Sequence, residues 1–170
     1  MTSLASAIGA ILVRELTSLR QEIEAYPSDA DLWRVVPGIT NSAGTLALHL
    51  AGNLQHFVGS ILGGTAYVRN RDVEFSARGL SKAELVAQVT DAISAVEQTF
   101  LRLGPADLES EYPEAVAKVR LNTGDFLIHL ASHLAYHLGQ VDYHRRIVTG
   151  NSATVGTVAP TKLASARPVQ

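Results

Sequence analysis

The histidines are the residues of this sequence whose type and spacing point most directly to chemistry. The 170-residue chain contains six of them, and His129, His133 and His137 follow one another at intervals of four. In an α-helix a four-residue step turns the side chain by only about 40°, so neighbours in this series share a face. Two imidazoles one turn apart can direct their nitrogens at a single ion about 2 Å from each. The spacing therefore predicts that His133 and His137 chelate one metal ion.

A third ligand must come from another part of the chain, and His49 is the natural candidate. It lies among Leu46, Leu50 and Leu54, whose helical spacing places it inward or at the edge of the core. Three protein ligands leave a coordination position open, which is the catalytic arrangement because water or a substrate atom can occupy it. The alternative is a histidine cluster on the solvent side of the helix. Single histidines such as His56 are interpreted as ordinary boundary residues.

The rest of the composition narrows the kind of metal. The chain has no cysteine, which excludes thiolate ligands, iron–sulfur clusters and disulfides. It contains no Glu-x-x-His pair, which a di-iron carboxylate bundle requires, and Met1 is its only methionine, which disfavours a His/Met haem. A mononuclear, all-imidazole site remains. Nitrogen ligands suit zinc, nickel, iron or copper(II) more than calcium or magnesium.

Four amphipathic segments are available to position these residues. Apolar side chains recur at spacings of three and four over residues 3–25, 41–62, 81–103 and 122–148, with a Ser-x-x-Glu capping box at Ser81 to Glu84. No alternating strand pattern competes with them. The sequence thus predicts an all-α fold, a four-helix bundle.

The segments between and after these helices are interpreted from their composition. Residues 65–79 are expected to be a long loop of solvated charges that follows the His49 helix and can cover a metal site. Residues 149–170 are rich in small residues and show no periodicity. We therefore expect one bundle domain over residues 1–148 and an extended or mobile arm over residues 149–170. Gly139, inside a helical pattern, predicts close approach by another helix.

The overall charge excludes one class of partner and the hydropathy argues against another. Lys and Arg number 14 against 16 Asp and Glu, for a net charge of -2, so no cationic field exists to hold nucleic acid. Apolar stretches are interrupted before the roughly 18 residues that a membrane span needs, and the first ten residues carry no positive leader region. A cytoplasmic protein with a small-molecule substrate is expected.

The motifs as a whole resemble a known family. His129 to Gln140 is similar to the HxxxHxxxHxGQ pattern, and Leu48 to Asn53 to the second-helix motif, of the DinB/YfiT-like superfamily of four-helix-bundle metalloenzymes. Tyr67 to Phe75 resembles the R-x-R-D-x-E-F signature of one subgroup. The resemblance covers nearly the whole chain.

The resemblance implies a ligand set and a choice of function. The ligands would be His49, His133 and His137, binding nickel or zinc, with iron as a further option. His129, which is not one of the three, would lie behind the ligands or in the pocket wall, where it could orient a ligand or bind substrate. It is the candidate catalytic residue. Relatives include transferases that use a low-molecular-weight thiol and hydrolases, and many are homodimers. The implied function is a metal-dependent enzyme of one of these two kinds; the alternative is a non-catalytic metal-binding or stress-response dimeric bundle.

One feature of the ligand helices separates the two chemistries. Hydrolysis needs a general base beside the ion, yet Asp125 and Asp142 each lie at least two turns from His133. This absence slightly favours thiol activation, although His129 could serve as a base.

Overall fold

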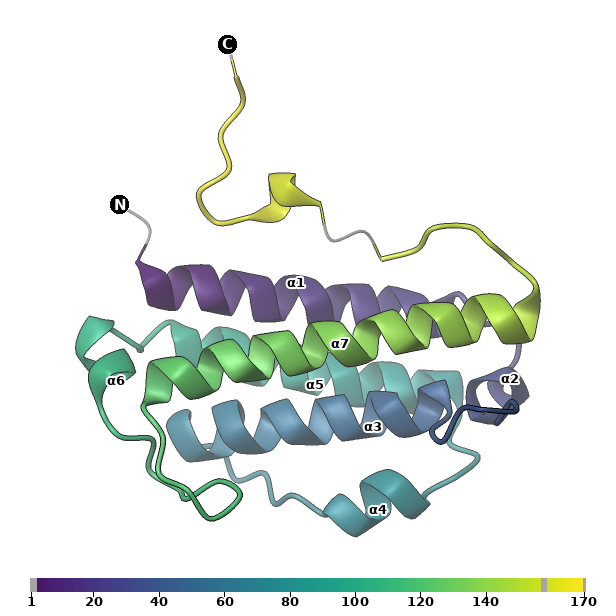
Figure 1. Cartoon of the computed structure of the whole chain (residues 1–170), viewed down its shortest axis with the longest axis horizontal. Coiled ribbons are helices and arrows are strands. Elements are labelled where there is room, and N and C mark those ends of the chain that lie inside the picture. The colour runs from purple at the N-terminus through teal and green to yellow at the C-terminus, as the bar shows by residue number, and fades with distance from the viewer. Residues whose placement is uncertain (1–2, 157–158, 170) are drawn as a thin grey trace.

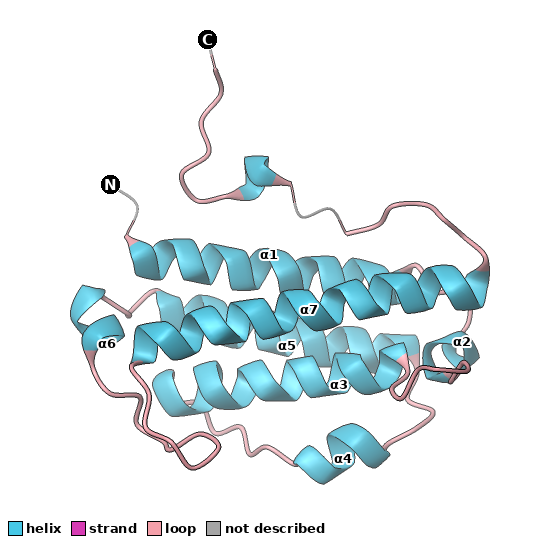
Figure 2. Ribbon diagram, viewed as in Figure 1, coloured by secondary structure: helices cyan, strands magenta, loops and turns pink. Residues whose placement is uncertain are grey.

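Long helices make up most of the structure (Figure 2). The computed structural model describes residues 3–156 and 159–169, and within these ranges it contains isolated bridges but no strand. The four longest helical stretches are α1 (Leu4–Glu24), α3 (Ala43–Leu54) continued by the π-helix η1 (Gln55–Leu62), α5 (Lys82–Phe100) and α7 (Thr123–Thr149). They lie side by side (Figure 1). The predicted four-helix bundle is confirmed.

The helices begin where the sequence has capping residues. The hydroxyl of Ser81 accepts from the N–H of Glu84, whose carboxylate accepts from the N–H of Ser81, so the predicted capping box is present. Ser42 caps α3 and Asn122 caps α7 through their side-chain oxygens. Local side-chain chemistry therefore sets the first turn of both helices that carry the histidines.

Four short helical segments were not expected. They are α2 (Asp29–Trp33), α4 (Arg71–Ser76), α6 (Pro105–Glu109) and the 3₁₀ turn η2 (Pro160–Lys162). Each is too short to show a hydrophobic period in the sequence. Helix α4 corrects the interpretation of residues 65–79 as a plain loop, because it packs along the outer side of α3 (Figure 1).

A leucine-rich core fixes the rotation of the two histidine-bearing helices. Leu50 and Leu134 are completely buried, and each directly follows a candidate ligand, His49 or His133. Since adjacent residues on a helix point about 100° apart, burying these leucines turns the histidines toward the groove between α3 and α7. Core packing thus presents the imidazoles to one another.

After α7 the chain turns back toward α1 (Figure 1). The buried guanidinium of Arg145 donates to the carbonyls of Asn151 and Ala153, and Arg146 donates to that of Ser152. The start of this segment is therefore attached to the bundle. The division of the chain into residues 1–148 and 149–170 stays a prediction, and residues 157–158 and 170 of the expected arm lie outside the described ranges.

In the described part of the chain, no helix combines the length and apolar character needed to cross a bilayer.

Candidate metal centre

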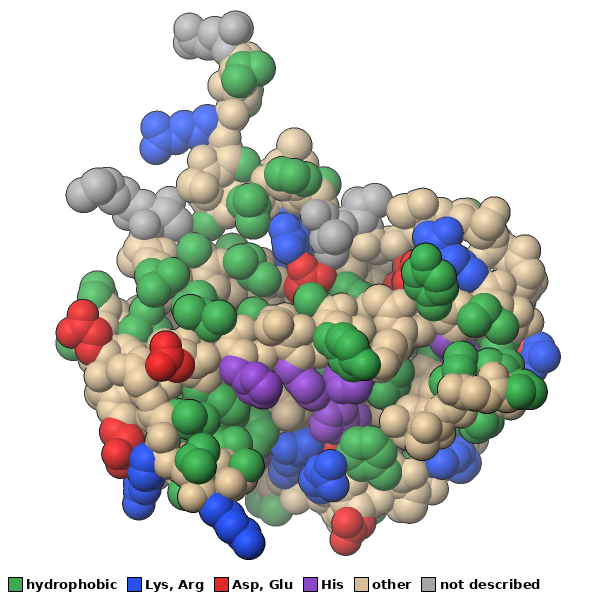
Figure 3. All heavy atoms as spheres, viewed as in Figure 1, with side chains coloured by type: hydrophobic (Ala, Val, Ile, Leu, Met, Phe, Trp, Pro, Cys, Tyr) green, Lys and Arg blue, Asp and Glu red, His purple; other side chains and the backbone are tan. Residues whose placement is uncertain are grey.

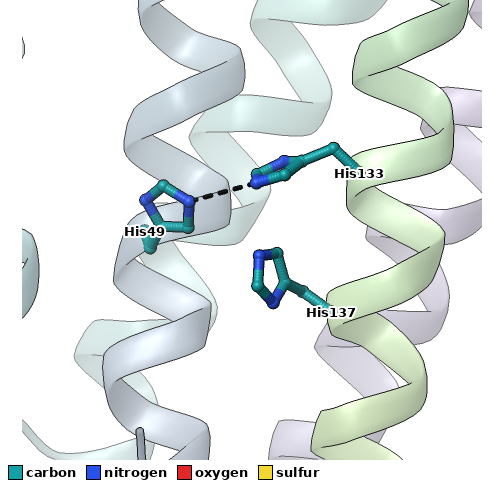
Figure 4. Close-up of side chains that lie close together, drawn as sticks. All are labelled: His49, His133 and His137. Atoms are coloured by element: carbon teal, nitrogen blue, oxygen red, sulfur yellow. Dashed lines mark hydrogen bonds between the residues drawn. The ribbon is translucent and has the colours of Figure 1, made fainter.

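Three imidazoles from two helices converge in the groove between α3 and α7. His49 projects from α3 and His133 and His137 from α7, with their rings turned toward one another (Figure 4). Each offers a nitrogen, and these three atoms lie within 4.8 Å of one another. His49 is buried and the other two are half-buried. The structure therefore brings together the three residues that the sequence singled out.

The spacing of the nitrogens suits a shared ion. The Nε2 atoms of His49 and His133 are 3.4 Å apart. Two nitrogens each about 2 Å from a tetrahedral ion stand about 3.3 Å apart, so this pair is already at the separation that one ion requires. The other nitrogen–nitrogen separations within the group of three are at most 4.8 Å. Where such a separation exceeds about 3.3 Å, one imidazole ring must rotate toward the ion for both nitrogens to bind it.

His49 is held from behind by a buried carboxylate. Its Nδ1 lies 3.1 Å from Oε2 of Glu74, and Arg69 donates to both oxygens of Glu74 at 2.7 and 2.8 Å. Burial alone would raise the pKa of Glu74, but hydrogen bonds from Arg69 and His49 outweigh it and hold the pKa below its usual range. An ionised carboxylate only accepts, so Nδ1 of His49 carries the hydrogen and Nε2 presents its lone pair.

Glu74 corrects the interpretation of this segment as a run of solvated charges. Its side chain is only 5% exposed, because α4 lies on α3 directly over Gly52. The next residue, Phe75, places its ring 4.9 Å from that of His49. Arg71 does remain exposed. The arginine-rich motif in the sequence contains Glu74, but the motif does not show which residue Glu74 contacts. Its partner, His49, is 25 positions away, and the pair becomes visible only in the packed structure.

The other two imidazoles are also suited to binding an ion. Nδ1 of His137 donates to Oε1 of Gln140 at 2.7 Å, which leaves Nε2 as its ligand atom. Burial, reinforced by the neighbouring histidines and Arg69, lowers the pKa of His133 to about 4. His133 is therefore neutral at pH 7, and the neutral imidazole is the form that binds a transition metal.

A further polar group near this face lacks a partner. Asn53 lies one turn beyond His49 on α3, is 7% exposed, and its Oδ1 forms no hydrogen bond to the described chain. Buried acceptors in folded proteins are nearly always satisfied. This oxygen is therefore available to accept a hydrogen bond from water or a bound molecule. The sequence analysis did not single out Asn53.

His129 lies at the rim of the cluster. It is exposed, with its ring 6.1 Å from that of His133 and 6.0 Å from that of Phe126, both nearly parallel. It does not belong to the group of three converging nitrogens. Histidine side chains form a continuous patch on this face, with basic side chains close by (Figure 3). The cluster is thus open to solvent; the catalytic role of His129 stays a prediction.

Two acids on the elements around the site, Glu74 on α4 and Asp142 on α7, are already paired with arginines. Glu74 reaches His49, but Arg69 occupies both of its oxygens. Asp142, the acid on α7 that lies C-terminal to the ligands, accepts from Arg145 and Arg146. These carboxylates are therefore poorly placed to act as a general base.

Gly139 does not have the role that its position suggested. A Cβ built on it would meet nothing within 4 Å among the described residues, and the residue is exposed. The predicted close approach of another helix is therefore absent from the described part of this chain.

Comparison with known proteins agrees with the fold. No curated protein matches the sequence. A family model described as the DinB superfamily matches residues 11–141, which include all of the candidate ligands. The chain, with its four-helix bundle, therefore belongs to the DinB superfamily.

Proposed function

We propose that this protein is a divalent-metal-dependent enzyme that acts on a small molecule, with thiol S-transfer favoured over hydrolysis. The observation that carries the proposal is the convergence of three imidazole nitrogens from α3 and α7 within 4.8 Å. Three ligands leave room for an incoming atom, and the half-buried His133 and His137 make that position accessible.

Each residue of the site has a distinct task in this proposal. His49, His133 and His137 would hold the ion, with nickel or zinc as our first choice and iron as a further option. The Arg69 and Glu74 pair keeps the ring of His49 in one orientation and one tautomer. A bound divalent ion would supply Lewis acidity, which lowers the pKa of a thiol or of water. His129, which is exposed, would exchange a proton with solvent in this proposal.

The preference for thiol transfer rests on two carboxylates near the site, neither of which is free to act as a general base. A thiol whose pKa is lowered needs no separate base, whereas attack by water is usually assisted by one. Because Glu74 and Asp142 are both paired with arginines, the site suits the first chemistry better.

The experiment measures metal content and turnover in the full-length protein purified without a histidine tag. We expect about one divalent ion per chain by elemental analysis, and conjugation of an electrophile to one of a panel of low-molecular-weight thiols. Stoichiometric metal without turnover on thiols or on hydrolase substrates would instead support the alternative, a non-catalytic metal-binding bundle.

A pair of variants tests the ligand assignment. His133→Ala should lose the ion while its helical circular dichroism is unchanged. His56→Ala is the matched control, because His56 lies on η1 beside Glu114 and outside the cluster. Unchanged metal content in His133→Ala would show that the assignment is wrong.

A further inference from the structure

A cavity of about 390 Å³ adjoins the histidine cluster, between the beginning of α3 and the C-terminal half of α7. His137 belongs to both the cluster and the cavity wall, and Leu46 lies one turn before His49 on α3. The cavity is therefore the next compartment of the same groove. Its other lining residues include Thr40, Asn41, Tyr136, Gln140 and Tyr143.

Apart from two imidazoles, the lining of this cavity contains no acidic or basic side chain. None of its residues is Lys, Arg, Asp or Glu. Its second imidazole, His144, contacts the hydroxyl of Tyr26 through Nδ1 at 2.7 Å and the carbonyl of Arg34 through Nε2 at 2.8 Å. Burial lowers the pKa of His144, so it is neutral at pH 7. An ionic group that entered would find no Lys, Arg, Asp or Glu partner in the lining.

The groups that the cavity does offer are aromatic rings and neutral hydrogen-bonding atoms. Tyr136 and Tyr143 are 67% and 68% exposed. Gln140 uses its Oε1 to accept from His137, which leaves its amide N–H groups available. Aromatic walls with a few neutral polar groups are typical of sites for flat, uncharged ligands, and the volume suits a small organic group.

We infer that this cavity is a substrate subsite that takes an uncharged, ring-bearing group of the molecule whose donor atom reaches the three-histidine centre. The inference rests on the proposed function, because it assigns the second part of the same small molecule. It assigns specificity to residues of the chain that bind no metal, above all Tyr143.

The test uses the full-length protein loaded with cobalt(II), whose thiolate complexes absorb in the near ultraviolet. Three probes are titrated without oxygen: ethanethiol, 2-phenylethanethiol and 3-mercaptopropionate. We expect 2-phenylethanethiol to bind about tenfold more tightly than ethanethiol because its ring enters the cavity. The charged 3-mercaptopropionate should bind no more tightly than ethanethiol.

A matched pair of variants locates the effect. Tyr143→Ala should reduce the tenfold preference to about threefold or less, because the ring loses one aromatic wall. Ile147→Ala should retain it, since Ile147 is exposed one turn further along α7 and does not line the cavity.

The failures are distinguishable. Equal affinity for all three thiols, or equal loss of the preference in both variants, would overturn the subsite while leaving the metal-dependent enzyme in place. Cobalt that binds in the expected stoichiometry but gives no thiolate band with any probe would overturn the proposed thiol chemistry, and the subsite with it.

Discussion

Glu74 shows how one buried side chain can orient a candidate metal ligand. It accepts from Nδ1 of His49 and is itself fixed by Arg69, so the orientation of the imidazole is set before any ion arrives. A carboxylate behind a ligating histidine also makes its free nitrogen a stronger donor. The residue therefore acts through His49, as a positioning residue.

Glu74→Gln should weaken metal binding about 10- to 100-fold, because the amide cannot accept two hydrogen bonds from Arg69 and one from His49 equally well. Competition with a chromophoric chelator measures the affinity. Asp72→Asn is the matched control, since Asp72 is exposed on the same short helix and should leave the affinity unchanged. Unaltered affinity in Glu74→Gln would contradict the positioning role.

His144 should make the metal-free protein less stable in acid. Its pKa in the fold lies below the ordinary value of 6.5, chiefly through burial. Below pH 6.5 the unfolded chain takes up a proton that the folded chain refuses, so the free energy of unfolding falls as the pH falls. His144→Gln should be less stable at pH 7 but lose less between pH 7 and 5.5 in urea unfolding. The same loss in both proteins would refute this.

At the scale of elements, two glycines on the histidine-bearing helices have opposite surroundings. Gly52 on α3 lies under α4, where a Cβ would stand 2.9 Å from the carboxyl carbon of Glu74 and 3.1 Å from the hydroxyl of Tyr67. Gly139 on α7 has open space around it. Only the first glycine is required by packing within the described chain.

Alanine at the two positions should therefore act in opposite directions. Gly52→Ala should displace Glu74, which lowers both stability and metal affinity. Gly139→Ala should raise stability by up to about 1 kcal/mol through helix propensity alone. Denaturant unfolding and analytical ultracentrifugation check both. If the homodimer implied by the family resemblance uses this face of α7, Gly139→Ala will instead weaken the dimer. If Gly139→Ala destabilises the monomer, our description of open space around Gly139 is contradicted.

At the scale of the whole molecule, Arg145 connects the bundle to the chain that follows it. Its side chain is 1% exposed and pairs with the equally buried Glu22 of α1, while its other donors reach the carbonyls of Asn151 and Ala153. One guanidinium thus links α1, α7 and the start of the C-terminal segment. Loss of this link affects three parts of the fold at once.

Arg145→Met should cost about 3–5 kcal/mol of unfolding free energy, because it leaves the Glu22 carboxylate buried without a partner. The double variant Glu22→Leu with Arg145→Met should recover most of that loss, since no unpaired charge remains. Guanidinium unfolding followed by circular dichroism measures both. A single variant as stable as the parent protein would show that the pair contributes little.

The features that depend on near neighbours could be predicted from the amino-acid sequence. Helical periodicity, the capping residues and the four-residue spacing from His129 to His137 predicted the bundle and the pair of histidines on α7, because all are set by contacts within one or two turns. The place of His49 among Leu46, Leu50 and Leu54 made it the candidate for their companion, and the resemblance to the family, confirmed for residues 11–141, implied the same residue. Its role as a ligand, like theirs, stays a prediction.

Contacts between residues far apart in the chain became evident from the packing of the helices. The burial of Glu74 behind His49, the open surroundings of Gly139 and the cavity beside His137 arise from how α3, α4 and α7 pack. A short segment such as α4 carries too few residues to reveal its buried face, so a charged residue in it resembles any solvated one. Its partner becomes evident only when the leucine core has brought the helices together.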